Sequence, residues 1–161
     1  MAIVACKIYP LDELRDLRCV LAHGTFDLFH IGHLKYLKAA KSYGPLAVTL
    51  TAGSYIRNHG PGRPVFTDEE RLEMIDALGF VNYVSMVYDE TALPAIRMIK
   101  PRLYCKGDET RREGNSVLEQ EIAAVKEGGG DVVFIPKLLP YSSGALLSGK
   151  ILDQRIYADH V

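Results

Sequence analysis

Short apolar runs alternate with longer amphipathic runs along almost the whole chain. The apolar runs predict five strands, at residues 18–23, 46–51, 82–87, 102–105 and 131–135. The amphipathic runs that follow them predict helices at about 31–43, 68–78, 91–99, 116–127 and 143–154. Strands that alternate with helices in this way build a sheet whose two faces are covered by helices. The pattern therefore predicts an α/β fold with a five-stranded, mostly parallel sheet.

Local signals set several of these boundaries. Gly44 ends the first helix, and the continuously apolar strand 46–51 after it is expected to be buried on both faces. Thr67, with Glu70 three residues later, predicts a capping box at the start of the second helix. Pro94 is tolerated only if it lies in the first turn of the third helix.

Composition narrows the domain organisation and the classes of partner. In a chain of 161 residues, five strands and their connections leave no length for a second domain, so residues 1–161 are expected to form a single domain. The 19 Lys and Arg residues balance 20 Asp and Glu residues, and no basic run stands out. This balance argues against nucleic acid as a partner, because surfaces that bind nucleic acid concentrate Lys and Arg.

The apolar runs are too short for a membrane protein. The longest, such as residues 46–52, fall well short of the ~20 residues that a membrane span needs. Residues 1–9 lack the charged and apolar regions of a signal peptide. Cys6, Cys19 and Cys105 lie far apart, which suits reduced thiols better than disulfides. We therefore expect a soluble, cytoplasmic protein.

The segment between the first strand and the first helix, residues 23–33, reads HGTFDLFHIGH. In an open parallel sheet, ligands bind beyond the carboxyl ends of the strands, where such a loop meets a helix N-terminus. The free amides and the positive dipole end of that helix suit a phosphate chain. His30 and His33 lie three residues apart on one face of the first turn, and Gly24 and Gly32 allow a nucleotide to approach closely. The segment therefore predicts a phosphate-binding site.

Other interpretations of the histidines remain open. A single histidine at a helix start is more often a cap or a core residue, but two histidines with two glycines favour anion binding. His30, His33 and His23 could instead bind zinc. Because a third ligand at convincing spacing is missing, we predict no metal site built from the protein's own side chains.

This segment and three later motifs resemble the sequences of a known enzyme family. GTFDLFHIGH resembles the HxGH signature of the cytidylyltransferase-like nucleotidyltransferases, and the resemblance runs from about residue 20 to residue 151. Residues 58–66, NHGPGRPVF, are similar to the NKGPGRPVF loop of adenylyltransferases of the heptose-1-phosphate type. Residues 99–107 resemble their IKPDxYxKG segment, and residues 140–143 resemble their closing YST or FSS motif. Glycerol-3-phosphate cytidylyltransferase is similar by the same marks, but more distantly.

The resemblance implies a single Rossmann-like domain that joins a nucleoside triphosphate to a phosphorylated small molecule and releases pyrophosphate. It implies Mg²⁺ on the triphosphate and a homodimer. The GPGRPVF loop favours ATP, with CTP as the alternative. The implied catalytic residues are His30, His33 and Arg63. The implied nucleotide-binding residues are Gly24, Thr25, Phe26, Gly32, His59, Arg71, Lys106, Gly107, Asp108, Ser142 and Ser143.

Several of these residues also have a structural interpretation. Arg71, which the resemblance implies faces the substrates or closes the loop over them, could instead be a solvated charge on a helix. Ser142 and Ser143 could be helix caps, the commoner role for serine before an apolar run. Lys106 and Gly107 could simply form a strand end and a turn.

Four positions depart from the pattern of the similar enzymes. His59 stands for a loop lysine, Gly53 for an aspartate after the second strand, and Gly144 for a hydroxyl residue. The segment 106–109 is one residue shorter than its counterpart. A heptose phosphate acceptor therefore does not follow from the resemblance. A nucleotide-binding regulatory module without turnover is the alternative of another class.

Overall fold

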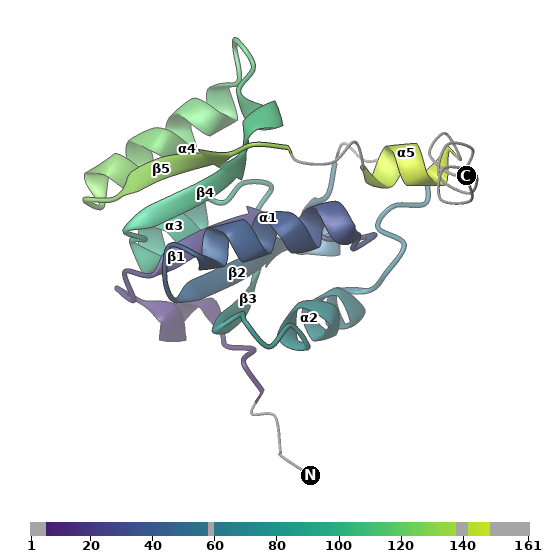
Figure 1. The fold of residues 1–161 in the computed structure, drawn as a ribbon, viewed down its shortest axis with the longest axis horizontal. Coiled ribbons are helices and arrows are strands. Elements are labelled where there is room, and N and C mark those ends of the chain that lie inside the picture. The colour runs from purple at the N-terminus through teal and green to yellow at the C-terminus, as the bar shows by residue number, and fades with distance from the viewer. Residues whose placement is uncertain (1–5, 58–59, 138–141, 149–161) are drawn as a thin grey trace, which may run out of the picture.

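The computed structural model describes residues 6–57, 60–137 and 142–148, and in them five parallel strands form one sheet (Figure 1). The strands are β1 (Val20–Gly24), β2 (Leu46–Thr51), β3 (Tyr83–Val87), β4 (Leu103–Gly107) and β5 (Asp131–Ile135). Their order across the sheet is β3-β2-β1-β4-β5. This is a Rossmann-like order, and it confirms the predicted α/β fold with a parallel sheet.

Helices cover both faces of the sheet. The α-helices of the described residues are α1 (Ile31–Lys41), α2 (Asp68–Asp76), α3 (Leu93–Ile99), α4 (Ser116–Glu127) and α5 (Ser143–Leu147). Short 3₁₀ turns occur at η1 (Leu11–Leu14), η2 (Gly53–Tyr55) and η3 (Asp108–Thr110). None of the helices in the described residues is long and apolar enough to cross a membrane.

The alternation of side chains along the strands divides the core into two layers. Val20 and Ala22 of β1 belong to a cluster with residues of α1 and α2, whereas Leu21 belongs to a cluster with residues of α3 and α4. Because β2 contributes to both layers, all six of its residues are buried. The continuous apolar run that predicted a doubly buried strand is thereby explained.

Most predicted boundaries agree with the structure, and the differences have local causes. The capping box of α2 is present: the Glu70 amide donates to Thr67 Oγ1 (3.2 Å), and the Thr67 amide donates to Glu70 Oε2 (2.9 Å). Pro94 lies in the first turn of α3, as predicted. Strand β1 begins two residues later than predicted, because Arg18 has a φ of 51° and leaves the extended conformation. The predicted end of the last helix lies outside the described residues.

Other elements also differ in length from their predictions, among them β4 and α1. Strand β4 continues to Gly107, two residues further than predicted, because Lys106 and Gly107 pair with Phe134 and Ile135 of β5. Helix α1 ends at Lys41, and the turn that follows leads directly into β2. The longer β4 carries its last residues to the edge where β1 also ends.

Candidate functional site

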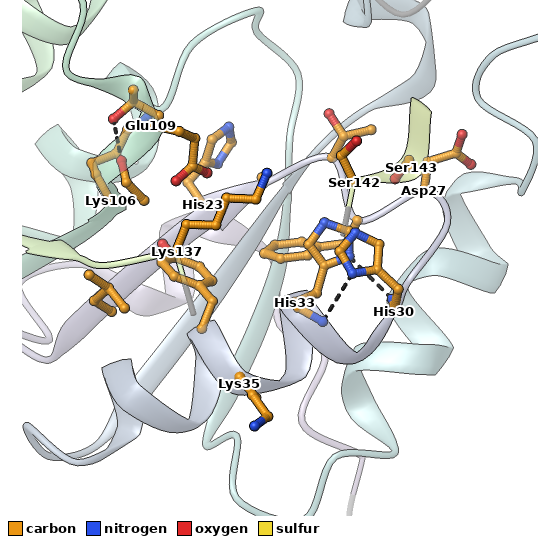
Figure 2. Close-up of a pocket in the computed structure, with 18 of the residues that line it drawn as sticks. His23, Asp27, His30, His33, Lys35, Lys106, Glu109, Lys137, Ser142 and Ser143 are labelled. Atoms are coloured by element: carbon orange, nitrogen blue, oxygen red, sulfur yellow. Dashed lines mark hydrogen bonds between the residues drawn. The ribbon is translucent and has the colours of Figure 1, made fainter. Parts of the chain in front are cut away.

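A pocket of about 550 Å³ lies where the chain leaves β1 and β4 in opposite directions, the switch point of the sheet (Figure 2). Most of the predicted site residues line it. They are Gly24, Thr25, Phe26, His30, Gly32, His33, Arg63, Lys106, Gly107, Ser142 and Ser143. His59 lies outside the described residues, and its predicted role stays a prediction.

His30 and His33 cap the N-terminus of α1 with their own rings. The Gly32 amide donates to His30 Nδ1 (3.0 Å), and the His30 amide donates to His33 Nδ1 (3.3 Å). The two rings stack with their centroids 3.8 Å apart. Because each Nδ1 accepts an amide proton, each neutral ring carries its own proton on Nε2. Both rings line the pocket, so the pair provides two N–H donors at a helix N-terminus.

Both histidines are held in the neutral form. Burial, with a smaller effect of neighbouring His30, lowers the pKa of His33 to about 4. Burial, with a smaller effect of Lys137, also lowers the pKa of His30. Phe26 contributes to this burial, since its ring meets that of His33 edge to face at 5.3 Å between centroids. The pair therefore offers hydrogen bonds, rather than fixed positive charge, to a ligand at neutral pH.

Asp27, which we did not predict as a site residue, joins two loops at the rim of the pocket. Its buried carboxylate accepts the amides of Val65 (2.8 Å) and Phe66 (3.0 Å) and pairs with the guanidinium of Arg63. Burial alone would raise the pKa of Asp27, but the Phe66 and Val65 amides and Arg63 hold it below its usual value. The Gly- and Pro-rich loop is thus tied to the β1–α1 loop, and its Arg63 side chain is fixed in the pocket wall.

Arg71 lies in neither place expected for it. Its side chain is fully buried and does not line the pocket. One of its Nη atoms donates to the carbonyls of Thr25 (2.7 Å) and Thr51 (2.9 Å), and the other pairs with Asp68. These carbonyls belong to the ends of neighbouring strands, where the chain turns away and the backbone needs other donors. Arg71 therefore stabilises the β1–α1 loop through its hydrogen bond to the Thr25 carbonyl.

The glycine at position 53 is explained by the same cluster. The Gly53 amide donates to Asp68 Oδ1 (2.8 Å), and a Cβ at position 53 would lie 3.0 Å from that oxygen. Asp68 thus occupies the space beside Gly53 and supplies the carboxylate that pairs with Arg71. The similar enzymes have an aspartate at the position of Gly53. In this chain the negative charge beside Arg71 comes instead from Asp68, at the start of α2.

Lys106 and Gly107 lie at the pocket, but Asp108 does not. Lys106 Nζ lies 3.1 Å from Glu121 Oε2 in an ion pair. Asp108 begins η3 and is exposed, at 3.5 Å from the Arg111 guanidinium, and its predicted contact with the nucleotide stays a prediction. Glu109, the next residue, lines the pocket instead.

Ser142 is observed as the N-cap of α5, which is its structural interpretation. Its Oγ accepts the amide of Ala145 at 3.1 Å. Ser142 and its neighbour Ser143 also line the pocket, facing the histidine pair in Figure 2. Their predicted contact with phosphates stays a prediction.

His23 is engaged within the sheet rather than with the other histidines. Its Nδ1 lies 2.9 Å from Thr49 Oγ1, and its Nε2 lies 3.0 Å from Thr51 Oγ1. Burial, followed by the charge of Lys106, lowers the pKa of His23 to about 3, against a smaller opposing effect of Asp89. In the part of the chain that the structure describes, no group of three His, Cys, Asp or Glu residues could hold a metal ion.

Residues 21–143 match the family described as Cytidylyltransferase-like. Bifunctional protein HldE of Trichlorobacter lovleyi is 33% identical over 135 residues, which cover 83% of this chain and 27% of the relative. Bifunctional protein HldE of Sulfurimonas denitrificans is 41% identical over 108 residues, which cover 66% and 22%. The chain thus spans about a quarter of the length of these relatives.

Two solved structures resemble the chain. The lipopolysaccharide core biosynthesis protein of Thermoplasma volcanium has a TM-score of 0.60 and 26% identity, over 76% of this chain and 97% of that chain. Pantoate-beta-alanine ligase of Francisella tularensis, solved with beta-gamma ATP and beta-alanine, has a TM-score of 0.58 and 12% identity. That match covers 96% of this chain and 82% of the ligase, and it shows a similar fold alone.

Proposed function

This chain belongs to the cytidylyltransferase-like family of nucleotidyltransferases, and we propose that it transfers the nucleotidyl group of ATP to a sugar phosphate or a similar phosphorylated metabolite. A phosphate oxygen of the acceptor attacks the α-phosphorus and forms a new P–O bond. The bond between the α-phosphorus and the oxygen that bridges to the β-phosphorus breaks, and pyrophosphate leaves. The protein forms no covalent bond to either substrate.

The observation that carries this proposal is the pair His30 and His33. Each ring is fixed by a backbone amide at Nδ1, so its Nε2–H is oriented before a ligand arrives. Preorganised donors that point at developing negative charge contribute much of the rate enhancement in such catalysis, because they need no rearrangement during the reaction. Phosphoryl and nucleotidyl transfer depends mostly on positioning and charge stabilisation. The histidine pair, at the N-terminus of α1, is proposed to position a triphosphate and to stabilise its developing charge.

Arg63 is proposed to add positive charge at the same site. Its Nε is taken by Asp27, and the side chain is 7% exposed. An arginine presents five N–H donors, so a guanidinium that is anchored through Nε keeps others for a ligand. Its fixed position in the pocket wall suits a role in stabilising the transferred phosphates.

Mg²⁺ is proposed to enter with the triphosphate. Asp27 and Glu109 are the carboxylates that line the pocket in the described part of the chain, and Asp27 is already occupied by Arg63 and two amides. Mg²⁺ usually keeps several waters and needs only one or two carboxylates beside substrate phosphates. The residues present therefore fit a metal held mainly by the nucleotide, which would neutralise the charge of the leaving pyrophosphate.

The substrate class rests on the relatives. The T. volcanium neighbour is named for lipopolysaccharide core biosynthesis, and this suggests a phosphorylated sugar as acceptor for the present chain. The similarity of the 60–66 loop to adenylyltransferases supports ATP over CTP. We further propose a homodimer that acts in the cytoplasm, where Cys19 and Cys105 stay as the free, buried thiols that the structure shows.

A pyrophosphate-release screen tests the proposal. ATP, CTP, GTP and UTP are each combined with a panel of sugar and polyol phosphates and Mg²⁺, with His33→Ala as a matched control. We expect release with ATP and at least one sugar phosphate. Pyrophosphate release with CTP alone would show that the protein is a cytidylyltransferase. Nucleotide binding without release from any pair, at high protein concentration, would instead support a regulatory module.

A further inference from the structure

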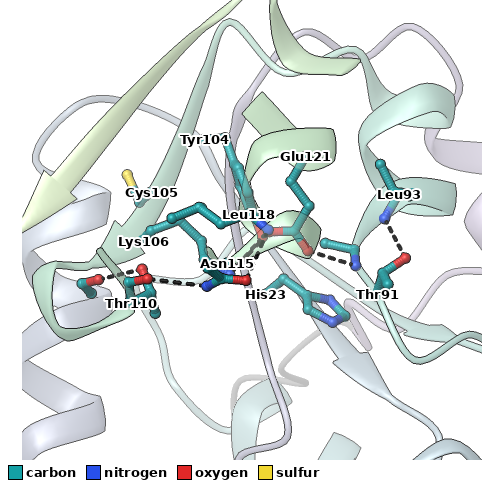
Figure 3. A network of polar contacts seen from close by, with 12 residues as sticks. His23, Thr91, Leu93, Tyr104, Cys105, Lys106, Thr110, Asn115, Leu118 and Glu121 are labelled. Atoms are coloured by element: carbon teal, nitrogen blue, oxygen red, sulfur yellow. Dashed lines mark hydrogen bonds and ion pairs between the residues drawn. The ribbon is translucent and has the colours of Figure 1, made fainter. Parts of the chain in front are cut away.

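Glu121 is a buried carboxylate on α4 that no sequence motif singles out. It is 2% exposed, and its carboxylate contacts polar groups of other elements (Figure 3). Oε1 accepts the amide of Ala92 (3.1 Å), and Oε2 lies 3.1 Å from both the Tyr104 hydroxyl and Lys106 Nζ. A buried charge is costly unless it is paired and hydrogen-bonded. This carboxylate joins α4 to two other segments, the start of α3 and strand β4.

The protonation state of Tyr104 determines which groups donate in its hydrogen bonds with Glu121 and Lys106. Burial, followed by the charge of Glu121, raises the pKa of Tyr104 well above its ordinary value. The hydroxyl therefore keeps its proton and donates it to Glu121. Its oxygen is left to accept from Lys106 Nζ, at 3.3 Å.

Lys106 is thereby left with one N–H for the pocket. An ammonium group has three donors. Glu121 takes one and the Tyr104 hydroxyl takes a second, and no described residue accepts the third. Because Lys106 lines the pocket, this remaining N–H is available to a ligand.

The position of Lys106 indicates which part of the ligand it meets. In Figure 2, Lys106 lies across the pocket from His30, His33 and Ser142, which surround the N-termini of α1 and α5. The ion pair with Glu121 also leaves Lys106 with little net charge to attract phosphate. A single N–H of fixed direction suits a neutral oxygen or nitrogen instead, as in a ribose or a base.

We propose that Glu121 is a positioning residue: it holds Lys106 so that one ammonium N–H contacts the nucleoside part of the nucleotide. The inference rests on the proposed function for its ligand. It adds a residue outside the known motifs, and it explains why α4 places a carboxylate on its buried face. Glu121 itself does not contact substrate.

The variant Glu121→Gln tests this, because it keeps the shape of the side chain and removes its charge. The control is Glu119→Gln, the same change on an exposed position of the same helix. Calorimetric titrations use ATP, CTP and inorganic tripolyphosphate, which has no nucleoside. We expect Glu121→Gln to weaken binding of the preferred nucleotide about tenfold, the scale of one charge-assisted hydrogen bond, and tripolyphosphate binding to stay within about twofold. At saturating substrates, kcat should change less than about threefold, so the effect appears in KM.

A second variant separates positioning from folding. Lys106→Met should show the same selective loss for the nucleotide, and adding Glu121→Gln to Lys106→Met should cause no further loss beyond about twofold. Equal losses for nucleotide and tripolyphosphate, an unchanged nucleotide affinity, or independent tenfold losses in the double variant would each overturn the role of Glu121. If Glu121→Gln does not fold, Lys106→Met still tests the contact on which the role of Glu121 depends, and an unchanged nucleotide affinity in Lys106→Met overturns the proposal.

The proposed function fails in a distinguishable way. If the wild type binds nucleotide but releases no pyrophosphate with any acceptor, that function is wrong, while the titrations still decide the role of Glu121. A wild type that binds neither ATP nor CTP contradicts both.

Discussion

Mild acid should destabilise this protein through His23. The ring lies between the Thr49 and Thr51 hydroxyls, at 2.9 and 3.0 Å, and burial with the charge of Lys106 lowers its pKa to about 3. In the unfolded chain the ring is in water, where the pKa of histidine is about 6.5. The folded protein therefore keeps His23 neutral over a pH range in which the unfolded chain binds a proton.

The sign and the size follow from this difference. Below pH ~6.5 the unfolded state binds more protons than the folded state, so the free energy of unfolding falls as the pH falls from about 6.5 toward 3. At pH ~5 the difference spans about 1.5 pH units, and at about 1.36 kcal/mol per unit His23 alone removes about 2 kcal/mol. His33, whose pKa is lowered to about 4, acts in the same direction.

Urea unfolding at pH ~7.5 and ~5 measures the effect. The wild type is compared with His23→Gln, which keeps one donor and one acceptor for the two threonines. We expect the variant to lose about 2 kcal/mol less than the wild type between the two pH values. His33→Gln should also reduce the loss, through a separate contribution, because the pKa of His33 is lowered as well. Equal losses in the wild type and in His23→Gln would refute a His23 that stays neutral in the folded protein.

Two further predictions concern the pocket. His33→Ala should lower kcat about 10²–10³-fold, because it removes a preorganised donor, while nucleotide affinity changes only a few-fold. Pyrophosphate release measures kcat, and calorimetry measures the affinity. Near-normal turnover in a folded His33→Ala variant would contradict this role. Asp27→Asn should lower the free energy of unfolding by about 3 kcal/mol, because it leaves the buried Arg63 charge unpaired. Urea unfolding tests this, and a loss below about 1 kcal/mol would show that the pair contributes little.

The parts of the fold that could be predicted are those encoded by local pattern. The continuous apolar run 46–51 identified a doubly buried strand, and the Thr67–Glu70 spacing identified the start of α2. The helical spacing of the apolar residues after His33 predicts a helix that begins near the two histidines of the HxGH segment, as observed. In each case the relevant partners lie within a few residues, so the sequence contains the information directly.

The parts that could not be predicted depend on partners far along the chain. Arg71 is buried because two carbonyls from the ends of β1 and β2 converge on it, and no local pattern reveals that convergence. Asp108 turns outward because η3 begins at the end of β4. Glu121 did leave a signal: with Leu118 and Val125 it occupies a stripe of helical spacing, which places a carboxylate on the buried face of α4.

The central claim is that the nucleotidyl group, and not the terminal phosphate, moves to a sugar phosphate. Isotopic labelling tests it directly: ATP carries ³²P at the α- or the γ-position, and the products are separated after incubation with Mg²⁺ and the acceptor. We expect the α-label to appear in a nucleotide-linked sugar and the γ-label to appear in pyrophosphate. Transfer of the γ-label to the acceptor, or no transfer of the α-label to any sugar phosphate, would contradict the proposed reaction.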